Sequence, residues 1–208
     1  MYKRTFFLVI ALIVISFAGC SKSDSPVTAN EPQYLIPLAV GNYWKMDVSV
    51  YDSTGNKIYS GVSAVALAGT TLIGNDTGFT IEDIVIVNRT DGTYQFDKND
   101  LSKFIMYFKY PANIGDKWSI SSTKNGTLLV KSETISVPAG TFNCSKYQFE
   151  SIVKVYASDS LLMSSHYQKE LFWICPGKGF IKQETYESLD NGIIFLKMAG
   201  ELKEYKLY

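Results

Sequence analysis

The second half of the chain alternates apolar and polar residues over stretches much longer than the connections between them. Short turn sequences such as PAGTF, SDS, CPGKG and LDNG separate these stretches. A two-residue period is typical of strands with one buried face, and Gly, Pro, Asn and Asp favour tight turns. The pattern predicts an all-β fold, an antiparallel meander that forms a strongly curved sheet, an open barrel or a sandwich. The alternating stretches are residues 127–137, 145–157, 161–174, 179–188 and 192–207.

The first half repeats this scheme in two hairpins. One begins at Tyr43 and turns at DSTGN, and the other covers residues 78–96 and turns at Thr90-Asp91-Gly92. The segment that follows, DKNDLSKFIMYFKY at residues 97–110, also fits a short helix, because four of its apolar residues have helical spacing. Its aromatic second half favours a strand instead, so we predict a turn followed by a strand.

A short motif occurs twice, as PLAVGNYW at residues 37–44 and as PANIGDKW at residues 111–118. The Pro restricts φ, the Gly permits a positive φ, and the Asn or Asp side chain can bond to the local backbone. We therefore interpret the motif as a turn that starts a strand with a buried Trp. The alternative is that Trp44, Trp118 and Trp173 line a cavity and contact a ligand.

The N-terminus has the order of a secretory signal. Residues 1–19 contain a basic start, an apolar run and a small-residue end, and that run is too short to span a membrane. The sequence Phe17-Ala18-Gly19-Cys20 resembles the lipobox of bacterial lipoproteins, which implies that Cys20 is acylated and anchors the protein to the membrane. Residues 20–33 form a polar, flexible tether, and residues 34–208 form a single β domain.

The tether also bears on localisation. Lys22 and Asp24 resemble the surface-export signal of lipoproteins from the Bacteroidetes group. We expect an outer-membrane protein, on either the periplasmic face or the cell surface.

The charges are balanced and dispersed. The chain has 20 basic and 20 acidic residues, and without the basic pair of the signal peptide the net charge is about −2. Nucleic-acid binding requires a concentrated basic surface, so we predict no nucleic-acid partner.

Catalytic and metal-binding patterns are weak. The one histidine, His166, lies in an alternating stretch, and the nucleophile motif G-x-S-x-G does not occur. His166 with Cys144 and Cys175 lacks the close-spaced ligand pairs of a zinc site. We predict no catalytic residues, no metal and no cofactor.

Cys144 and Cys175 remain as an even pair once Cys20 is acylated. In an oxidising compartment they can form a disulfide, and two buried free thiols are the alternative. The triplets Asp52-Ser53-Thr54 and Asp159-Ser160-Leu161 resemble acceptor sites for Bacteroidetes O-glycosylation.

Four segments together resemble a known group of proteins. They are YLIPLAVGNYW, YPANIGDKW, ISVPAGTFNCSKY and LFWICPGKGFIKQE, within residues 34–190. They resemble a family of uncharacterised secreted and lipid-anchored bacterial proteins, common in Bacteroidetes, with the motifs PL-x-x-G-x-x-W, VPAGTF and PG-x-G. The resemblance implies a β-rich fold similar to periplasmic lipid carriers and implies no particular activity.

These observations favour a non-catalytic, lipid-anchored protein of the outer membrane. We expect it to bind an apolar or amphipathic small molecule on the concave, aromatic side of its sheet. The alternative is a protein interaction module, such as an accessory subunit of a cell-envelope complex. An enzyme is the third possibility.

Overall fold

The computed structural model describes residues 33–156 and 162–208, and within these ranges the chain forms strands and turns without a helix. All paired strands are antiparallel. The predicted all-β antiparallel fold is therefore confirmed. The signal peptide, Cys20, nearly all of the tether and Asp159-Ser160-Leu161 lie outside the described residues.

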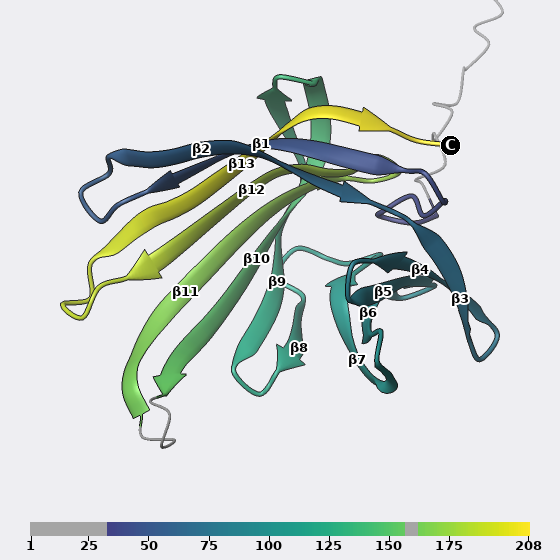
Figure 1. The fold of residues 1–208 in the computed structure, drawn as a ribbon, viewed down its shortest axis with the longest axis horizontal. Helices are drawn as coiled ribbons and strands as arrows, with labels where there is room; N and C mark the ends of the chain where they lie inside the picture. The colour runs from purple at the N-terminus through teal and green to yellow at the C-terminus, as the bar shows by residue number, and fades with distance from the viewer. Residues whose placement is uncertain (1–32, 157–161) are drawn as a thin grey trace, which may run out of the picture.

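The strands form two sheets. The large sheet has the order β2-β1-β13-β12-β11-β10-β9-β8, and the small sheet has the order β3-β4-β5-β6-β7. The large sheet curves like an arch, and the small sheet lies beneath one end of it (Figure 1). The strands are β1 (Tyr43–Tyr51), β2 (Lys57–Ala66), β3 (Gly69–Ile73), β4 (Asp76–Ile81), β5 (Ile84–Arg89), β6 (Gly92–Asp97), β7 (Asp100–Lys109), β8 (Lys117–Ser121), β9 (Lys124–Val137), β10 (Gly140–Tyr156), β11 (Leu162–Cys175), β12 (Gly179–Ser188) and β13 (Ile194–Lys206).

Both copies of the repeated motif form the same hydrogen-bonded turn ahead of a strand. In the first copy, Gly41 N donates to Leu67 O at 2.9 Å, and Leu67 N donates to the carbonyl of the residue after the glycine, also at 2.9 Å. In the second copy, Gly115 N donates to Leu128 O at 2.8 Å, and Leu128 N donates to Asp116 O at 3.1 Å. The two glycines have φ angles of 90° and 85°, which favour glycine. The predicted turn before a strand is present in both copies, with Trp44 buried and Trp118 half-buried.

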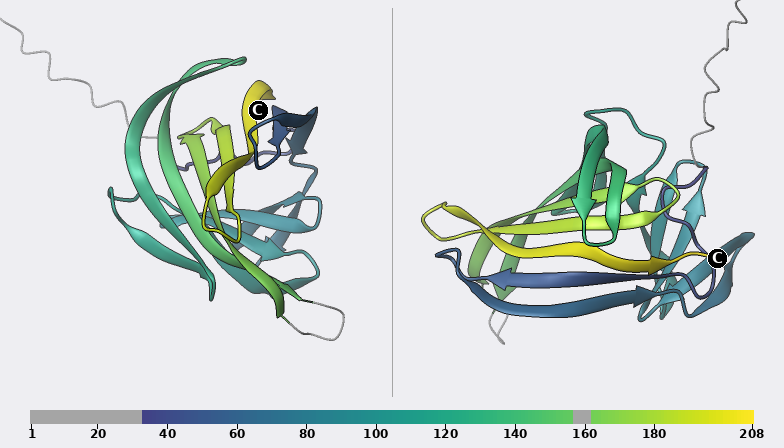
Figure 2. Two further views of the ribbon diagram at one scale, coloured as in Figure 1. Left: turned by 90° about the vertical axis from the view of Figure 1, so that its left-hand side faces the viewer. Right: turned by 90° about the horizontal axis from the view of Figure 1, so that it is seen from above.

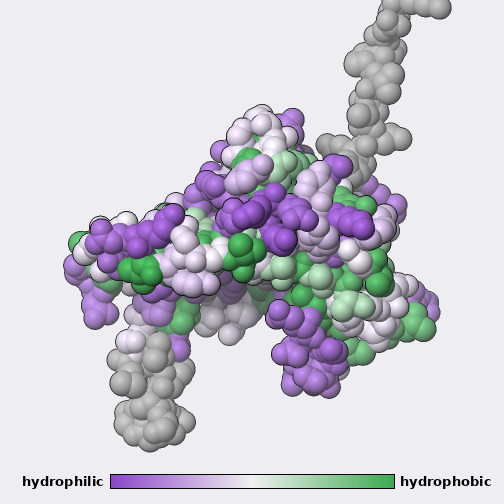
Figure 3. Space-filling view, turned by 45° about the horizontal axis from the view of Figure 1, so that its top comes forward, coloured by the Kyte–Doolittle hydropathy of each residue, from purple (hydrophilic) through white to green (hydrophobic). Residues whose placement is uncertain are grey.

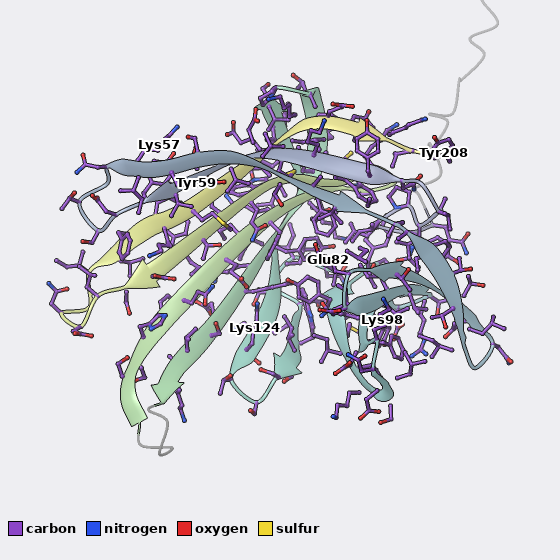
Figure 4. All side chains as sticks on the ribbon, viewed as in Figure 1. Lys57, Tyr59, Glu82, Lys98, Lys124 and Tyr208 are labelled. Carbon is purple, nitrogen blue, oxygen red and sulfur yellow. The ribbon has the colours of Figure 1, made fainter. Side chains whose placement is uncertain are left out.

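The Asn or Asp side chain of each motif completes its turn differently. The amide of buried Asn42 donates to Pro37 O at 3.0 Å and accepts from the backbone N–H of Tyr208 at 2.8 Å, near the C-terminus (Figure 4). Asp116 accepts from the backbone N–H of Asn113 at 3.1 Å and also pairs with Lys109 at 2.9 Å. The hydrogen bond from Lys109 holds the pKa of Asp116 below its usual value.

The segment that fitted either a helix or a strand forms β7. It pairs with β6, and the register shifts between Thr93↔Phe108 and Tyr94↔Met106, so Tyr107 is the extra residue of a β-bulge. A bulge changes the direction in which the neighbouring side chains point. Tyr107 and Phe108 therefore both pack into the main core, although they are consecutive. The predicted strand is confirmed, and the bulge is a feature that its sequence did not indicate.

The hairpin of β9 and β10 folds back over the large sheet. Figure 2 shows its tip crossing β12 and β13 on the side away from the small sheet. Ala139 N in this tip donates to Leu202 O at 3.0 Å, and Phe142 contacts Tyr205 edge to face, with their ring centroids 5.9 Å apart. The large sheet is therefore covered on both faces near this end.

The main hydrophobic core lies between the two sheets. Its buried residues include Ile81 and Phe108 from the small sheet and Trp44, Phe149 and Phe172 from the large sheet. Because one continuous cluster contains residues from both sheets, packing between the sheets contributes to the stability of each.

Candidate functional site

A cavity of about 390 Å³ lies between the two sheets. This volume is within the range of roughly 300 to 1,000 Å³ that is usual for small-molecule sites. The apolar lining includes Trp44, Met46, Val48, Ile84, Ile86 and Met198. The polar lining includes Ser63, Thr93, Gln95, Tyr107, Lys182 and Gln183. An apolar body with a few polar groups would fit such a lining.

The alternation of β1 places one face of that strand in the cavity wall. Trp44, Met46 and Val48 line the cavity, and Val48 pairs with Gly200 on β13. A Cβ atom at Gly200 would meet only side-chain atoms of Met46 and Val48, at 3.8 and 4.0 Å, and the φ angle of Gly200 is not positive. Gly200 therefore leaves room that a larger residue would occupy.

Trp44 is fixed in the wall by its neighbours. Its Nε1 donates to Lys178 O at 2.7 Å, and its ring meets Phe180 edge to face at 6.0 Å. Gly179 has a φ of 88°, and a Cβ atom there would lie 2.8 Å from the indole. The CPGKG turn between β11 and β12 thus fits closely against Trp44, which explains the glycine at position 179.

The bulged residue Tyr107 forms a polar point in the wall. Its ring packs edge to face on Phe149 at 5.1 Å, and among the described residues no hydrogen bond to its hydroxyl occurs. Burial, and then the nearby Glu170 carboxylate, raise the pKa of Tyr107 well above its ordinary value. The hydroxyl therefore stays protonated at neutral pH and keeps its hydrogen-bond donor.

An ion pair between Lys124 and Glu170 lies beside Tyr107. The Lys124 ammonium is 5.2 Å from the Phe149 ring centroid and 5.9 Å from that of Tyr107 (Figure 4). The register places Glu170 opposite Phe149, on the concave face of the large sheet. This side of the aromatic cluster therefore carries a paired charge rather than a net charge.

The three tryptophans have different environments. Trp44 lines the cavity, whereas Trp118 and Trp173 are absent from its lining. Trp118 is half-buried against Tyr147 and Phe149 near the edge of the large sheet. Trp173 follows Phe172, a cavity residue, so its side chain points to the opposite face of β11. Of the three tryptophans considered as ligand contacts, Trp44 lies in the cavity wall, and Trp118 and Trp173 lie elsewhere.

Trp173 belongs to a charged cluster under the β9–β10 hairpin. Its Nε1 donates to Glu133 at 3.0 Å, and Lys146 and Lys182 lie 4.6 and 5.2 Å from its ring. Lys182 also pairs with Glu184 at 2.9 Å. Half-buried cations and carboxylates neutralise one another in this cluster, which gives Trp173 a structural role.

Cys144 and Cys175 occupy adjoining positions on β10 and β11. The ladder pairs Ser145 with Ile174, and the two cysteines are the next residues outward on each strand. Both are free thiols in the structure, Cys144 buried and Cys175 half-buried. Burial raises the pKa of Cys144 to about 12. Of the two alternatives for this pair, the structure has the free thiols.

The two thiols should react at different rates. We expect N-ethylmaleimide at pH 8 to label Cys175 well before Cys144, because Cys144 is buried whereas Cys175 is half-buried; burial raises the pKa of both thiols, and Lys178 partly offsets this at Cys175. Peptide mass mapping of the chain from Ser21 onward, with Cys175→Ser as the control, gives both rates. Equal rates would contradict the structure. Labelling that requires prior reduction would show that the disulfide forms in solution.

The described residues hold no cluster of potential metal ligands. His166 lies half-buried on β11 opposite Val153. In the ranges 33–156 and 162–208, no three His, Cys, Asp or Glu side chains come together as metal ligands. The same ranges also lack a helix long and apolar enough to cross a membrane.

Comparison with known proteins identifies relatives of this chain. A family model described as DUF3108-like matches residues 76–192, whereas no curated protein matches the chain. A predicted lipoprotein from Parabacteroides distasonis is similar in structure, with a TM-score of 0.54 and 18% identity over 85% of this chain and 100% of that one. A predicted exported protein with a YmcC-like fold from Bacteroides fragilis has a TM-score of 0.52 and 13% identity over 84% of this chain and 99% of that one. These two likenesses show a shared fold.

Proposed function

This chain belongs to the DUF3108-like family, and we propose that it binds an apolar or amphipathic small molecule without catalysing a reaction. The cavity between the two sheets is the observation that supports this function. Its volume of about 390 Å³ and its wall of Trp, Met, Val and Ile side chains suit an apolar ligand body. Such a void would leave its apolar lining without contacts, so a ligand that fills it gains affinity from apolar burial.

The polar lining suggests how the ligand lies. Tyr107 offers a hydroxyl without a protein partner, and the Lys124–Glu170 ion pair lies next to it. A ligand with one neutral polar group at this point and an apolar body toward Trp44 and Met198 would satisfy both parts of the wall. The charged residue of the lining, Lys182, is already paired with Glu184, so a ligand with a strong net charge would find no free counter-charge there.

We also propose that the protein is anchored by an acylated Cys20 to the outer membrane, on the periplasmic face or the cell surface. The lipobox-like sequence before Cys20 supports this location, and two proteins of the same fold are described as a predicted lipoprotein and a predicted exported protein. The alternative function, an interaction module of an envelope complex, is favoured by the exposed edge of β2, where Ile58 and Val62 face solvent.

Binding is testable with an apolar fluorescent probe. We expect 1-N-phenylnaphthylamine to bind the chain from Ser21 onward with one saturable site and micromolar affinity, with a blue-shifted emission that reports an apolar environment. This form keeps every strand that the structure describes. A linear increase in fluorescence without saturation would contradict the proposal, because it would indicate only weak adsorption to the surface.

A further inference from the structure

Two strands that follow each other in the chain, β2 and β3, are both sheet edges, and nearly all of both lies in one uncharged segment. β2 is an edge of the large sheet and β3 is an edge of the small sheet. From Ile58 to Asn75 the sequence has no Asp, Glu, Lys or Arg. Leu72 in β3 is also exposed. Figure 3 shows hydrophobic residues on the side of the molecule where β2 passes into β3.

An uncharged edge of this length is unusual for a protein that remains a monomer. Edge strands present unpaired N–H and C=O groups, and natural proteins protect them with charges, prolines or short length. The other two edges follow that rule: β8 has only 5 residues, and β7 carries Asp100, Lys103 and Lys109. β2 has 10 residues, and Lys57 at its start is its single charge.

Most side chains of β2 are exposed, and they include large apolar ones. Ile58 is 62% exposed and Val62 is 55% exposed. Tyr59, also exposed, lies over Gly61, where a Cβ atom would be 2.2 Å from the Tyr59 hydroxyl (Figure 4). The ring covers the glycine and keeps this part of the strand extended, which prepares the edge for pairing.

We propose that a second copy of this chain pairs antiparallel with β2, centred on Val62. This register puts Val62 against Val62 of the second copy and Ile58 against Ala66 of the second copy. It places the two Lys57 side chains at opposite ends of the pair, so no like charges meet. The uncharged, apolar strand is thus complementary to itself, which favours a second copy over a partner that would be selected by charge.

The pairing would also extend the ligand site. Tyr59 of the second copy would lie opposite Val65, which lines the cavity together with Ser63. The large sheets of the two copies would become one continuous sheet. The inference rests on the edge alone and does not depend on the proposed ligand binding.

Sedimentation equilibrium of the chain from Ser21 onward tests the pairing. We expect a reversible dimer, and we expect Val62→Lys to raise its dissociation constant at least tenfold, because two ammonium groups would then meet at the centre. Ile152→Lys is the matched control, since Ile152 is also exposed but lies on β10, an inner strand of the same sheet. The control should dimerise like the original protein.

Two outcomes would overturn the proposal. One is a monomer at every concentration. The other is a dimer that Val62→Lys leaves unchanged, because its interface would then lie elsewhere. Circular dichroism confirms that each variant is folded, and Ile58→Lys replaces Val62→Lys if that variant does not fold.

Discussion

Phe108→Ala should lower the free energy of unfolding by about 3 to 5 kcal/mol, the usual range for the loss of a buried aromatic side chain. Phe108 is 0% exposed, and its side chain packs between the small sheet and the large sheet. Its ring contacts Tyr147, Phe149 and Phe172 of the large sheet, with centroid distances of 5.2, 5.3 and 5.7 Å. Urea unfolding followed by circular dichroism measures the change.

Phe104→Ala is the matched control for this prediction. Phe104 lies on the same strand as Phe108, but it is 52% exposed and stacks on Phe96 at the outer face of the small sheet. We expect a loss of about 1 kcal/mol or less, since little area is removed from burial. Equal losses for the two variants would contradict the packing that we describe between the sheets.

Gly200→Leu should lower the affinity for 1-N-phenylnaphthylamine at least tenfold while the protein stays folded. A side chain at Gly200 enters the cavity, because its first carbon meets only Met46 and Val48 at ordinary contact distances. Stability should hold or rise by about 0.5 to 1 kcal/mol, since glycine within a strand is unfavourable. Probe titration and urea unfolding of the same sample separate the two effects.

Ala199→Leu is the control for the cavity substitution. Ala199 precedes Gly200, so its side chain points to the opposite face of β13. The same leucine there should leave the probe affinity within a factor of two of the original value. If Gly200→Leu binds the probe as well as the original protein does, the probe does not occupy the cavity between the sheets.

Local alternation was sufficient to locate most strands. The alternating stretches between residues 127 and 207 correspond to β9 through β13, and the turn at Thr90–Gly92 joins β5 to β6. Asp52 shows why such turns are readable from sequence: its carboxylate accepts from the backbone of Thr54 and Asn56, both at 2.9 Å. These bonds depend on residues close together in the chain.

A sandwich was one of the expected arrangements, but the point at which the chain passes from one sheet to the other depends on distant residues and was not predicted. Only Leu67 and Ala68 separate β2 from β3. The backbone of Leu67 bonds to Gly41 and Asn42, and Ala68 N donates to Thr80 O at 3.0 Å. These bonds end the pairing with β1 and begin the small sheet. No periodicity within residues 57–73 indicates such a change of partner.

The site was predicted in part. The alternation of Trp44 with Met46 and Val48 indicated one face of a strand, and that face lines the cavity. The same reasoning could not distinguish Trp44 from Trp118 or Trp173, because the face on which each side chain lies depends on strand pairing. Tyr107 was missed for a related reason, since the bulge that turns it inward arises from the register with β6.

Native mass spectrometry tests the central claim most directly. The protein would be purified without detergent from the cells that produce it naturally, in the form from Ser21 onward, and its mass compared before and after denaturation. We predict extra mass that is lost on denaturation, that is extracted as an apolar or amphipathic molecule, and that is absent from Gly200→Leu. A native mass equal to that of the polypeptide, for a protein that also fails to bind the fluorescent probe, would contradict the ligand-binding function.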